Sequence, residues 1–130
     1  MVGRRKGSSS LTPLELQIMQ VLWRVGPSNV LQVQKNLPDD LDLAYTTVQT
    51  MLNVLQRKGR VRRSLKGRAY EYRAVISKES FLKQAVRDLV ERLFGGSSEE
   101  LVMSLIKSRQ IDPARIAELS QIAGQEGNKE

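Results

Sequence analysis

The chain has 130 residues with neither cysteine nor histidine, and its formal net charge is +7. This length predicts one small domain, alone or with an appendage. The two missing residue types exclude a disulfide framework, thiol chemistry and metal sites built on Cys or His, and they remove the commonest general acid–base group. We therefore expect a protein that is not an enzyme and that uses no cofactor or metal.

The positive charge is concentrated in the first part of the chain. Residues 1–77 carry 13 Lys and Arg against 5 Asp and Glu, while residues 78–130 carry 8 against 9. This asymmetry indicates a polyanion-binding module joined to a segment with another task, and a merely solubilising charged surface is the alternative. The sequence shows no run of about 18 apolar residues and no signal peptide, so we expect a cytoplasmic protein without membrane insertion.

Residues 1–10 are expected to form a flexible basic tail, and a first helix is predicted over about residues 13–24. Thr12 is placed to cap this helix, Pro13 suits its first position, and Glu15 would close a capping box. Its apolar stripe consists of Leu14, Ile18, Val21, Leu22 and Val25.

Two more helices are predicted next. The second is capped by Ser28, ends at Pro38 and carries Val30, Val33 and Leu37. The third ends at Gly59 and has two distinct faces when it is wound at about 100° per residue. Its inner face is apolar and consists of Val48, Met51, Leu52 and Leu55. Its outer face consists of Thr46, Gln49, Thr50, Asn53 and Arg57.

The outer face of the third helix is nearly free of carboxylates and rich in side chains that both donate and accept hydrogen bonds. Such groups read base edges in the major groove of DNA, and Arg57 is placed to contact a phosphate. Simple solvent exposure is the alternative for any one of these residues. Their alignment on one strip, opposite an apolar strip, favours a DNA-recognition helix.

A basic β-hairpin is predicted after the third helix. Residues 60–65 and 68–75 are strand-like and are separated by Lys66-Gly67, where glycine supplies the positive φ of a tight turn. Tyr70 and Tyr72 share one face and are expected to pack on the helices. The hairpin cations are Arg60, Arg62, Arg63, Lys66 and Arg68. We expect them to contact phosphates, and the alternative is an edge hairpin that uses charge to block sheet pairing.

From Ser77 onward the sequence predicts amphipathic helices with wide apolar stripes. Gly95-Gly96 ends the first, Ser97 or Ser98 caps the second, and Asp112-Pro113 begins the third. About fifty residues rarely bury enough surface to fold alone, so we expect a second copy of the chain to cover these stripes, with packing on the preceding helices as the alternative. The expected dimerisation residues are Phe81, Leu82, Val86, Leu89, Leu93, Leu101, Val102, Leu105 and Ile106.

These elements predict a mainly α fold with a small β-hairpin, in the order of a winged helix-turn-helix followed by helices. The expected boundaries are a tail at 1–10, the winged helix-turn-helix at 11–76, a helical dimerisation domain at 77–123 and a disordered tail at 124–130. The expected function is a dimeric, sequence-specific transcriptional regulator that binds double-stranded DNA at a palindromic operator. The alternative is a winged-helix module that docks an acidic protein partner.

Five stretches together resemble the penicillinase-repressor family, the BlaI/MecI type of bacterial winged-helix repressor with a copper-responsive CopY branch. They are Leu11-Thr-Pro-Leu-Glu, Trp23, Ala44-Tyr-Thr-Thr-Val-Gln-Thr-Met-Leu-Asn, Lys58-Gly59 and Gly67-Arg-Ala-Tyr-Glu-Tyr. The resemblance covers about residues 11–123 and implies a homodimeric repressor of a β-lactamase, antibiotic-resistance or related stress operon. It also implies DNA contacts at Thr46, Thr47 and Gln49.

The resemblance carries further implications and three departures. In the BlaI/MecI branch a membrane sensor metallopeptidase responds to β-lactam, and the repressor is then cleaved at an Asn-Phe bond in its dimerisation region. That bond aligns with Ser104-Leu105, so this chain lacks the cleavage dipeptide. The helix-capping serine of some members is Ala44 here, which removes about 1 kcal/mol of capping. The cysteine metal site of the copper branch is absent, which excludes copper sensing by that route.

Overall fold

A computed structural model of the protein describes residues 11–128, with side chains to residue 126. The chain divides into two units, the first ending at residue 85 and the second beginning at residue 86. This division falls inside a helix, later than the boundary that the sequence predicted after residue 76. The basic tail predicted at residues 1–10 lies outside the described residues.

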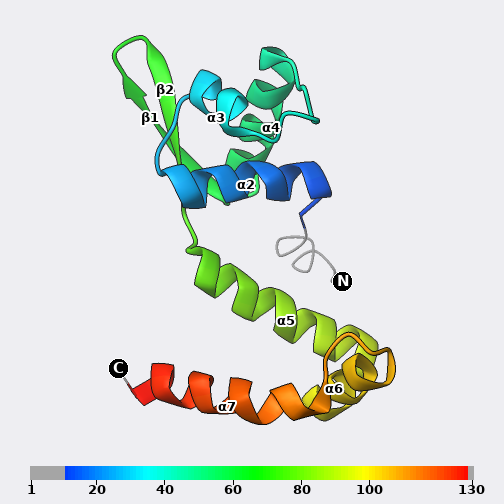
Figure 1. Cartoon of the computed structure of the whole chain (residues 1–130). Coiled ribbons are helices and arrows are strands. Elements are labelled where there is room, and N and C mark those ends of the chain that lie inside the picture. The colour runs from blue at the N-terminus through cyan, green and yellow to red at the C-terminus, as the bar shows by residue number, and fades with distance from the viewer. Residues whose placement is uncertain (1–10, 129–130) are drawn as a thin grey trace. The chain divides into compact units, whose positions relative to one another are not determined.

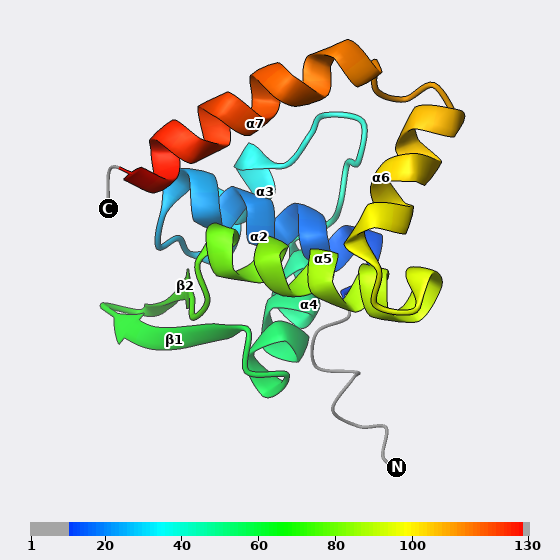
Figure 2. The ribbon, with the colours of Figure 1, turned by 90° about the horizontal axis from the view of Figure 1, so that it is seen from below.

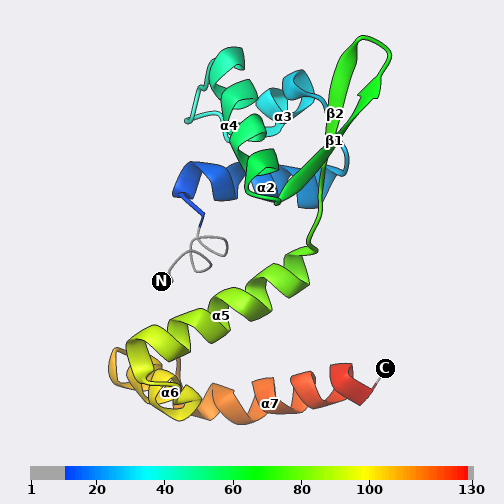
Figure 3. The same cartoon turned by 180° about the vertical axis from the view of Figure 1, so that it is seen from behind.

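The first unit has the order of elements of a winged helix-turn-helix. It contains α2 (Pro13–Val25), α3 (Val30–Asn36), α4 (Tyr45–Arg57), β1 (Val61–Lys66), β2 (Ala69–Ala74) and the first part of α5 (Lys78–Phe94) (Figure 1). Helices predominate in the described chain, and its two strands form one antiparallel hairpin. The predicted fold class, mainly α with a small hairpin, is therefore confirmed. We call α4 the recognition helix and the hairpin of β1, β2 and their turn the wing (Figure 3).

The predicted capping box begins α2. The Oγ1 atom of Thr12 accepts a hydrogen bond from the Glu15 backbone N–H at 3.1 Å, and the Glu15 carboxylate accepts one from the Thr12 backbone N–H at 3.0 Å. These reciprocal bonds satisfy amide donors that a helix start leaves without partners.

The cap of α3 differs from the prediction. Asn29, not Ser28, caps this helix, and Asn29 and Gln32 form a second capping box. Ser28 is fully buried, and its backbone exchanges two hydrogen bonds with Tyr72, at 2.9 and 2.8 Å. Ser28 thus adds a one-residue bridge to the wing, which ties the start of the helix-turn-helix to β2.

The recognition helix ends in a Schellman motif. The N–H of Arg60 donates to the carbonyl of Leu55, and the N–H of Gly59 donates to that of Gln56. Gly59 has φ +79°, a conformation that is unfavourable for residues with a Cβ. The motif turns the chain from α4 directly into β1.

The register of the wing places its side chains on two faces. Pairing runs from Val61 opposite Ala74 to Lys66 opposite Ala69, and Gly67-Arg68 forms the turn with Gly67 at φ +67°. The sequence predicted Lys66-Gly67 as the turn, but Lys66 is the last residue of β1 and pairs with Ala69. Because side chains alternate along a strand, an inner and an outer face follow from this register. The inner face carries Val61, Arg63, Leu65, Tyr70, Tyr72 and Ala74, and the outer face carries Arg62, Ser64, Lys66, Ala69, Glu71 and Arg73.

The core of the first unit is built from α2, α3, α4 and the base of the wing. Its apolar members are Ile18, Met19, Val21, Leu22, Val30, Val33, Leu37, Val48, Leu52, Leu55, Val61 and Tyr72. Tyr72, only 2% exposed, carries the wing into this core, as the sequence predicted. The same prediction is wrong for Tyr70, which is exposed and lies outside this core.

Trp23 joins α2 to the start of α5. Its indole N–H donates to the carbonyl of Ile76 at 2.9 Å, and its ring lies 5.4 Å from the ring of Phe81. Phe81 is only 8% exposed, so the structure corrects its expected role in dimerisation: its apolar surface is already covered inside the first unit. This contact also explains why the first unit extends past residue 76.

The second unit contains the rest of α5, α6 (Ser98–Lys107) and α7 (Pro113–Asn128), which short connections join (Figure 2). Ser97 caps α6 by accepting a hydrogen bond from the N–H of Glu100 at 3.1 Å. Because α7 extends to Asn128, the prediction of a disordered tail at 124–130 is wrong for residues 124–128, and the last two residues lie outside the described chain. In residues 11–128, no helix is long and apolar enough to cross a membrane.

Candidate nucleic-acid interface

The recognition helix separates polar and apolar residues sharply. Val48, Leu52 and Leu55 are fully buried against the rest of the first unit. The opposite side exposes Thr46, Thr47, Gln49, Thr50 and Arg57. A row of uncharged hydrogen-bonding side chains, with one cation at its end, therefore faces outward on this helix.

The start of the recognition helix lacks a side-chain cap. Ala44 occupies the N-cap position and makes no side-chain hydrogen bond, as its methyl group dictates. The first amide groups of α4 therefore have no capping side chain, and such groups are available to solvent or to an incoming acceptor.

Asn53 is placed differently from the other predicted residues of this helix. It is half-buried, and its Oδ1 atom accepts hydrogen bonds from Nη1 of Arg63 at 3.1 Å and from the hydroxyl of Tyr72 at 3.0 Å. The side chain of Asn53 therefore contacts the wing.

The predicted cations of the wing fall into two groups. Arg62, Lys66 and Arg68 are exposed, the first two on the outer face and the third in the turn. Arg63 lies on the inner face, where its guanidinium sits 4.1 Å from the centroid of the Tyr70 ring. This geometry is that of a cation–π contact, so Arg63 is engaged within the wing.

Arg73 is an outer-face cation outside the set that was predicted to contact phosphates. It lies opposite Arg62 in the register, and both side chains are exposed. Like charges in directly opposed positions destabilise a strand pair, and neither arginine forms an ion pair with a described residue. Because side chains alternate along a strand, the prediction that Tyr72 faces the helices also places the next residue, Arg73, on the outer face.

Arg60 does not lie on the exposed surface with the other hairpin cations. Only 8% of it is exposed, and its Nε atom has no hydrogen-bond partner among the described residues. Burial lowers the pKa of Arg60, and the negative charge of Glu15 acts in the opposite direction. The expectation that Arg60 contacts phosphate is therefore corrected, because the side chain is enclosed by the domain.

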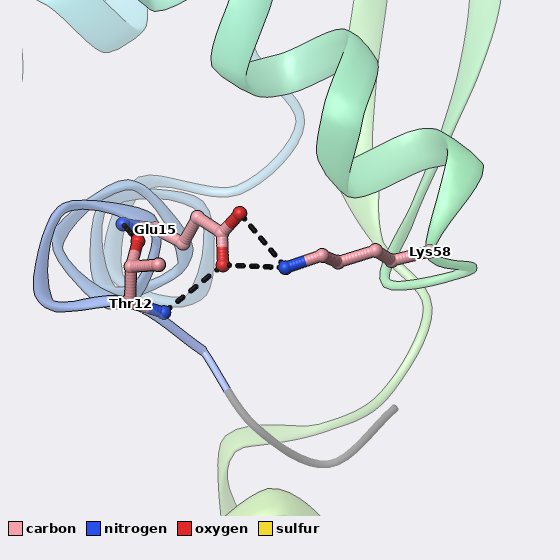
Figure 4. A network of polar contacts seen from close by, with 3 residues as sticks. All are labelled: Thr12, Glu15 and Lys58. Carbon is pink, nitrogen blue, oxygen red and sulfur yellow. Dashed lines mark hydrogen bonds and ion pairs between the residues drawn. The ribbon is translucent and has the colours of Figure 1, made fainter. Parts of the chain in front are cut away.

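Glu15 also links α2 to the end of the recognition helix (Figure 4). The Nζ atom of Lys58 lies 3.0 Å from both carboxylate oxygens of Glu15. Burial acts to raise the pKa of Glu15, but the hydrogen bonds from Thr12 and Lys58 and the charge of Lys58 outweigh it, so the pKa is lowered overall. The carboxylate is therefore charged at neutral pH and balances the cationic end of α4.

A groove of about 360 Å³ lies between the starts of α3 and α4 and the wing. Gln49 of the predicted base-reading face and Arg68 in the turn of the wing both line this groove. Its lining residues are Asn29, Val30, Leu31, Tyr45, Gln49, Arg68, Ala69, Tyr70 and Tyr72.

The residues expected in the dimer differ in exposure. Leu82, Val86, Leu89, Leu93 and Val102 are exposed, with Leu93 at 68%, and Leu101, Leu105 and Ile106 are half-buried. Ser104 is exposed in the middle of α6. Apart from Phe81, all of these residues leave apolar surface accessible in a single chain.

Comparison with known proteins identifies the family. The model of the penicillinase-repressor family matches residues 11–125, which is nearly the whole described chain. The chain belongs to the penicillinase-repressor family. It is therefore a DNA-binding transcriptional repressor and not an enzyme. The resemblance inferred from the five sequence stretches is confirmed.

Individual relatives agree with this assignment. The penicillinase repressor of Bacillus licheniformis is 26% identical over 119 residues, which cover 92% of this chain and 93% of that protein. The transcriptional regulator BlaI of Mycobacterium tuberculosis is 32% identical over 106 residues, covering 80% and 77% of the two chains. The solved structure of the transcriptional regulator Tm0710 of Thermotoga maritima superposes with a TM-score of 0.52 at 21% identity, covering 97% of this repressor and 79% of that chain, and it supports the fold.

Proposed function

We propose that this repressor binds a palindromic operator as a homodimer, with one recognition helix in the major groove of each half-site. The observation that carries the proposal is the exposed, uncharged polar row on α4 beside the exposed cations of the wing. A two-fold protein matches a two-fold operator, which sets half-sites about one helical turn, or a multiple of it, apart.

The proposed contacts divide by chemistry. Short hydrogen-bonding side chains and glutamine suit base edges, while cations suit phosphates and supply affinity without sequence preference. We assign Thr46, Thr47, Gln49 and Thr50 to base edges or adjacent backbone. We assign Arg57, Arg62, Lys66, Arg68 and Arg73 to phosphates.

The dimer is proposed to form through the second unit. It exposes more large apolar side chains than the single, scattered ones that are normal on a protein surface. The same surface of a second copy of the chain would cover them. The residues proposed for this interface are Val86, Leu89, Leu93, Leu101, Val102, Leu105 and Ile106 of the second unit, together with Leu82, which lies on α5 shortly before the second unit begins.

The regulated genes are proposed from the relatives. Two of the proteins that this chain resembles are named penicillinase repressors, from Bacillus licheniformis and Staphylococcus aureus. We propose a β-lactamase, antibiotic-resistance or related stress operon as the target, with the repressor acting in the cytoplasm.

A membrane sensor metallopeptidase is proposed as the inducing partner, and the Ser104–Leu105 bond is its proposed cleavage position by family alignment, with a different dipeptide from the Asn-Phe of the BlaI/MecI branch. This bond lies inside α6, and a helical backbone must open locally before a protease can hold it in extended form. Cleavage there would separate α7 from α5 and remove part of the proposed dimer surface. Incubation with membranes carrying the peptidase, followed by mass analysis of the fragments, tests this step, and a cut elsewhere would contradict it.

Selection of bound duplexes from a random DNA library tests the proposed function. We expect recovery of an inverted repeat, bound with a steep dependence on salt concentration. Lys66→Ala should weaken binding to all duplexes and make the salt slope shallower by about one unit per lost phosphate contact. Lys107→Ala, an exposed lysine on α6, is the control. An unchanged slope for Lys66→Ala would show that the wing does not contact DNA.

A further inference from the structure

On the predicted outer face of α4, Asn53 is the one residue whose side-chain oxygen accepts hydrogen bonds from other described residues. Arginine can only donate hydrogen bonds, so its contact at 3.1 Å identifies the oxygen of the amide as the group that faces the wing. The hydroxyl of Tyr72 donates to the same oxygen at 3.0 Å. Two donors therefore converge on a single acceptor.

The two donors come from opposite strands of the wing. Arg63 in β1 and Tyr72 in β2 are directly paired in the register. Arg63 also lies over the ring of Tyr70, and the backbone of Tyr72 pairs with Ser28 before α3. Asn53 thus connects the recognition helix to both strands at the point where the wing leaves the core.

We propose that Asn53 is a positioning residue that fixes the wing relative to the recognition helix and does not read a base. The proposal rests on the proposed function, in which α4 and the wing contact one DNA site together. A two-stranded hairpin alone is only marginally stable in water, so its direction has to be set by contacts at its base. Holding the wing before DNA arrives lowers the ordering cost of binding.

A base-reading role for Asn53 would need the same atom. An asparagine that recognises adenine accepts a hydrogen bond at Oδ1 and donates one from Nδ2. Here Oδ1 already has two donors, and contact with adenine would require the wing to release it. The neighbouring Gln49 is exposed, and its side chain forms no hydrogen bond with another described residue.

Two substitutions of Asn53 separate the roles. Asn53→Asp retains an acceptor for Arg63 and Tyr72 but loses the amide donor that a base reader needs. Asn53→Leu keeps the branching and the number of heavy atoms of the side chain and loses the acceptor. Each variant is assayed as the full chain on the selected operator, on a set of operators with every base pair substituted singly, and on random duplex.

Positioning predicts a specific pattern of results. Asn53→Leu should bind the operator at least about tenfold more weakly, with a shallower salt slope, while its preference at each base pair stays as in the wild type. Asn53→Asp should weaken operator and random duplex alike because of its added negative charge, and it should keep the ratio of the two affinities. Tyr72→Phe combined with Asn53→Leu should be no worse than Asn53→Leu alone, because both remove the same contact.

Loss of preference at one base pair in Asn53→Asp would overturn the proposal, as would additive losses in the double variant. If Asn53→Leu does not fold, judged by its circular dichroism, the comparison of Asn53→Asp with Tyr72→Phe still decides. Gln49→Ala is the matched control, because it should lose preference at one base pair. If Gln49→Ala and the wild type show identical preferences, the assignment of base reading to α4 fails, and this outcome differs from a failure of the Asn53 proposal.

Discussion

Gln49 is exposed near the start of the recognition helix and lines the groove beside the wing. Because it can donate and accept at once, we expect Gln49→Ala to lower discrimination at one base position by about 1–3 kcal/mol. Competition gel shifts with singly substituted operators measure this loss. Gln20→Ala, an exposed glutamine on α2, is the control. Equal weakening on operator and random duplex would make Gln49 a backbone contact.

Glu15 makes the stability of the first unit depend on pH. Its pKa is lowered in the folded protein, so the charged carboxylate adds stability above the ordinary glutamate pKa, and this stability is lost as the pH falls through the lowered value. Glu15→Gln keeps the capping box and removes the charge that faces Lys58.

We expect Glu15→Gln to cost roughly 1–3 kcal/mol at pH 7 and much less at pH values below the lowered pKa of Glu15, where the wild-type carboxylate is protonated. Urea unfolding of both proteins across this pH range measures the difference. Lys107→Gln controls for the loss of an ordinary surface charge. A difference that does not change with pH would show that the charge of Glu15 adds no stability.

At the scale of elements, helix ends with a purely local signal could be predicted from the sequence. The capping box at Thr12, the glycine end of α4 and the proline start of α7 all depend on residues within one turn. Asn29 and Gln32 carry the same kind of local signal, but Ser28 is an equally good cap by sequence. Only the pairing of Ser28 with Tyr72, a contact between distant parts of the chain, decides between them.

The roles of Phe81 and Asn53 could not be predicted for the same reason. Helical periodicity identifies an apolar or a polar face but does not tell which partner covers it. Phe81 meets Trp23 across 58 positions in the sequence, and the partners of Asn53 belong to a hairpin whose packing against α4 is tertiary. The candidate site was therefore predicted at the level of faces, and the structure assigns the individual contacts.

The end of α6 provides an element-scale prediction. Arg109 has φ +61° in a Schellman motif, in which its N–H donates to Ile106 and that of Gln110 donates to Leu105. Glycine is the residue that adopts this conformation without strain, so Arg109→Gly should raise the stability of the second unit by up to about 1 kcal/mol. Thermal unfolding measures the gain, and Arg109→Ala should show none. A destabilised Arg109→Gly variant would contradict the assignment of strain to this position.

At the scale of the whole molecule, dimerisation is expected to depend on the exposed apolar residues of the second unit. Leu89→Glu combined with Leu93→Glu would place two charges on that surface, and desolvating them in an interface is costly. We expect the full-length double variant to sediment as a monomer. Its operator affinity should fall by roughly a hundredfold, because two linked readers bind far more tightly than one.

The matched control adds the same two charges at exposed polar positions, Gln84→Glu and Gln121→Glu, and it should remain dimeric. A double leucine variant that still sediments as a dimer would move the interface away from this face of α5.

In the proposed complex, two recognition helices bind one operator from the same side of the duplex. Hydroxyl-radical footprinting of the full-length repressor on its selected operator tests this claim most directly. We expect two protected regions related by two-fold symmetry, with centres a whole number of helical turns apart. A single asymmetric protected region, at protein concentrations that saturate the site, would contradict the account.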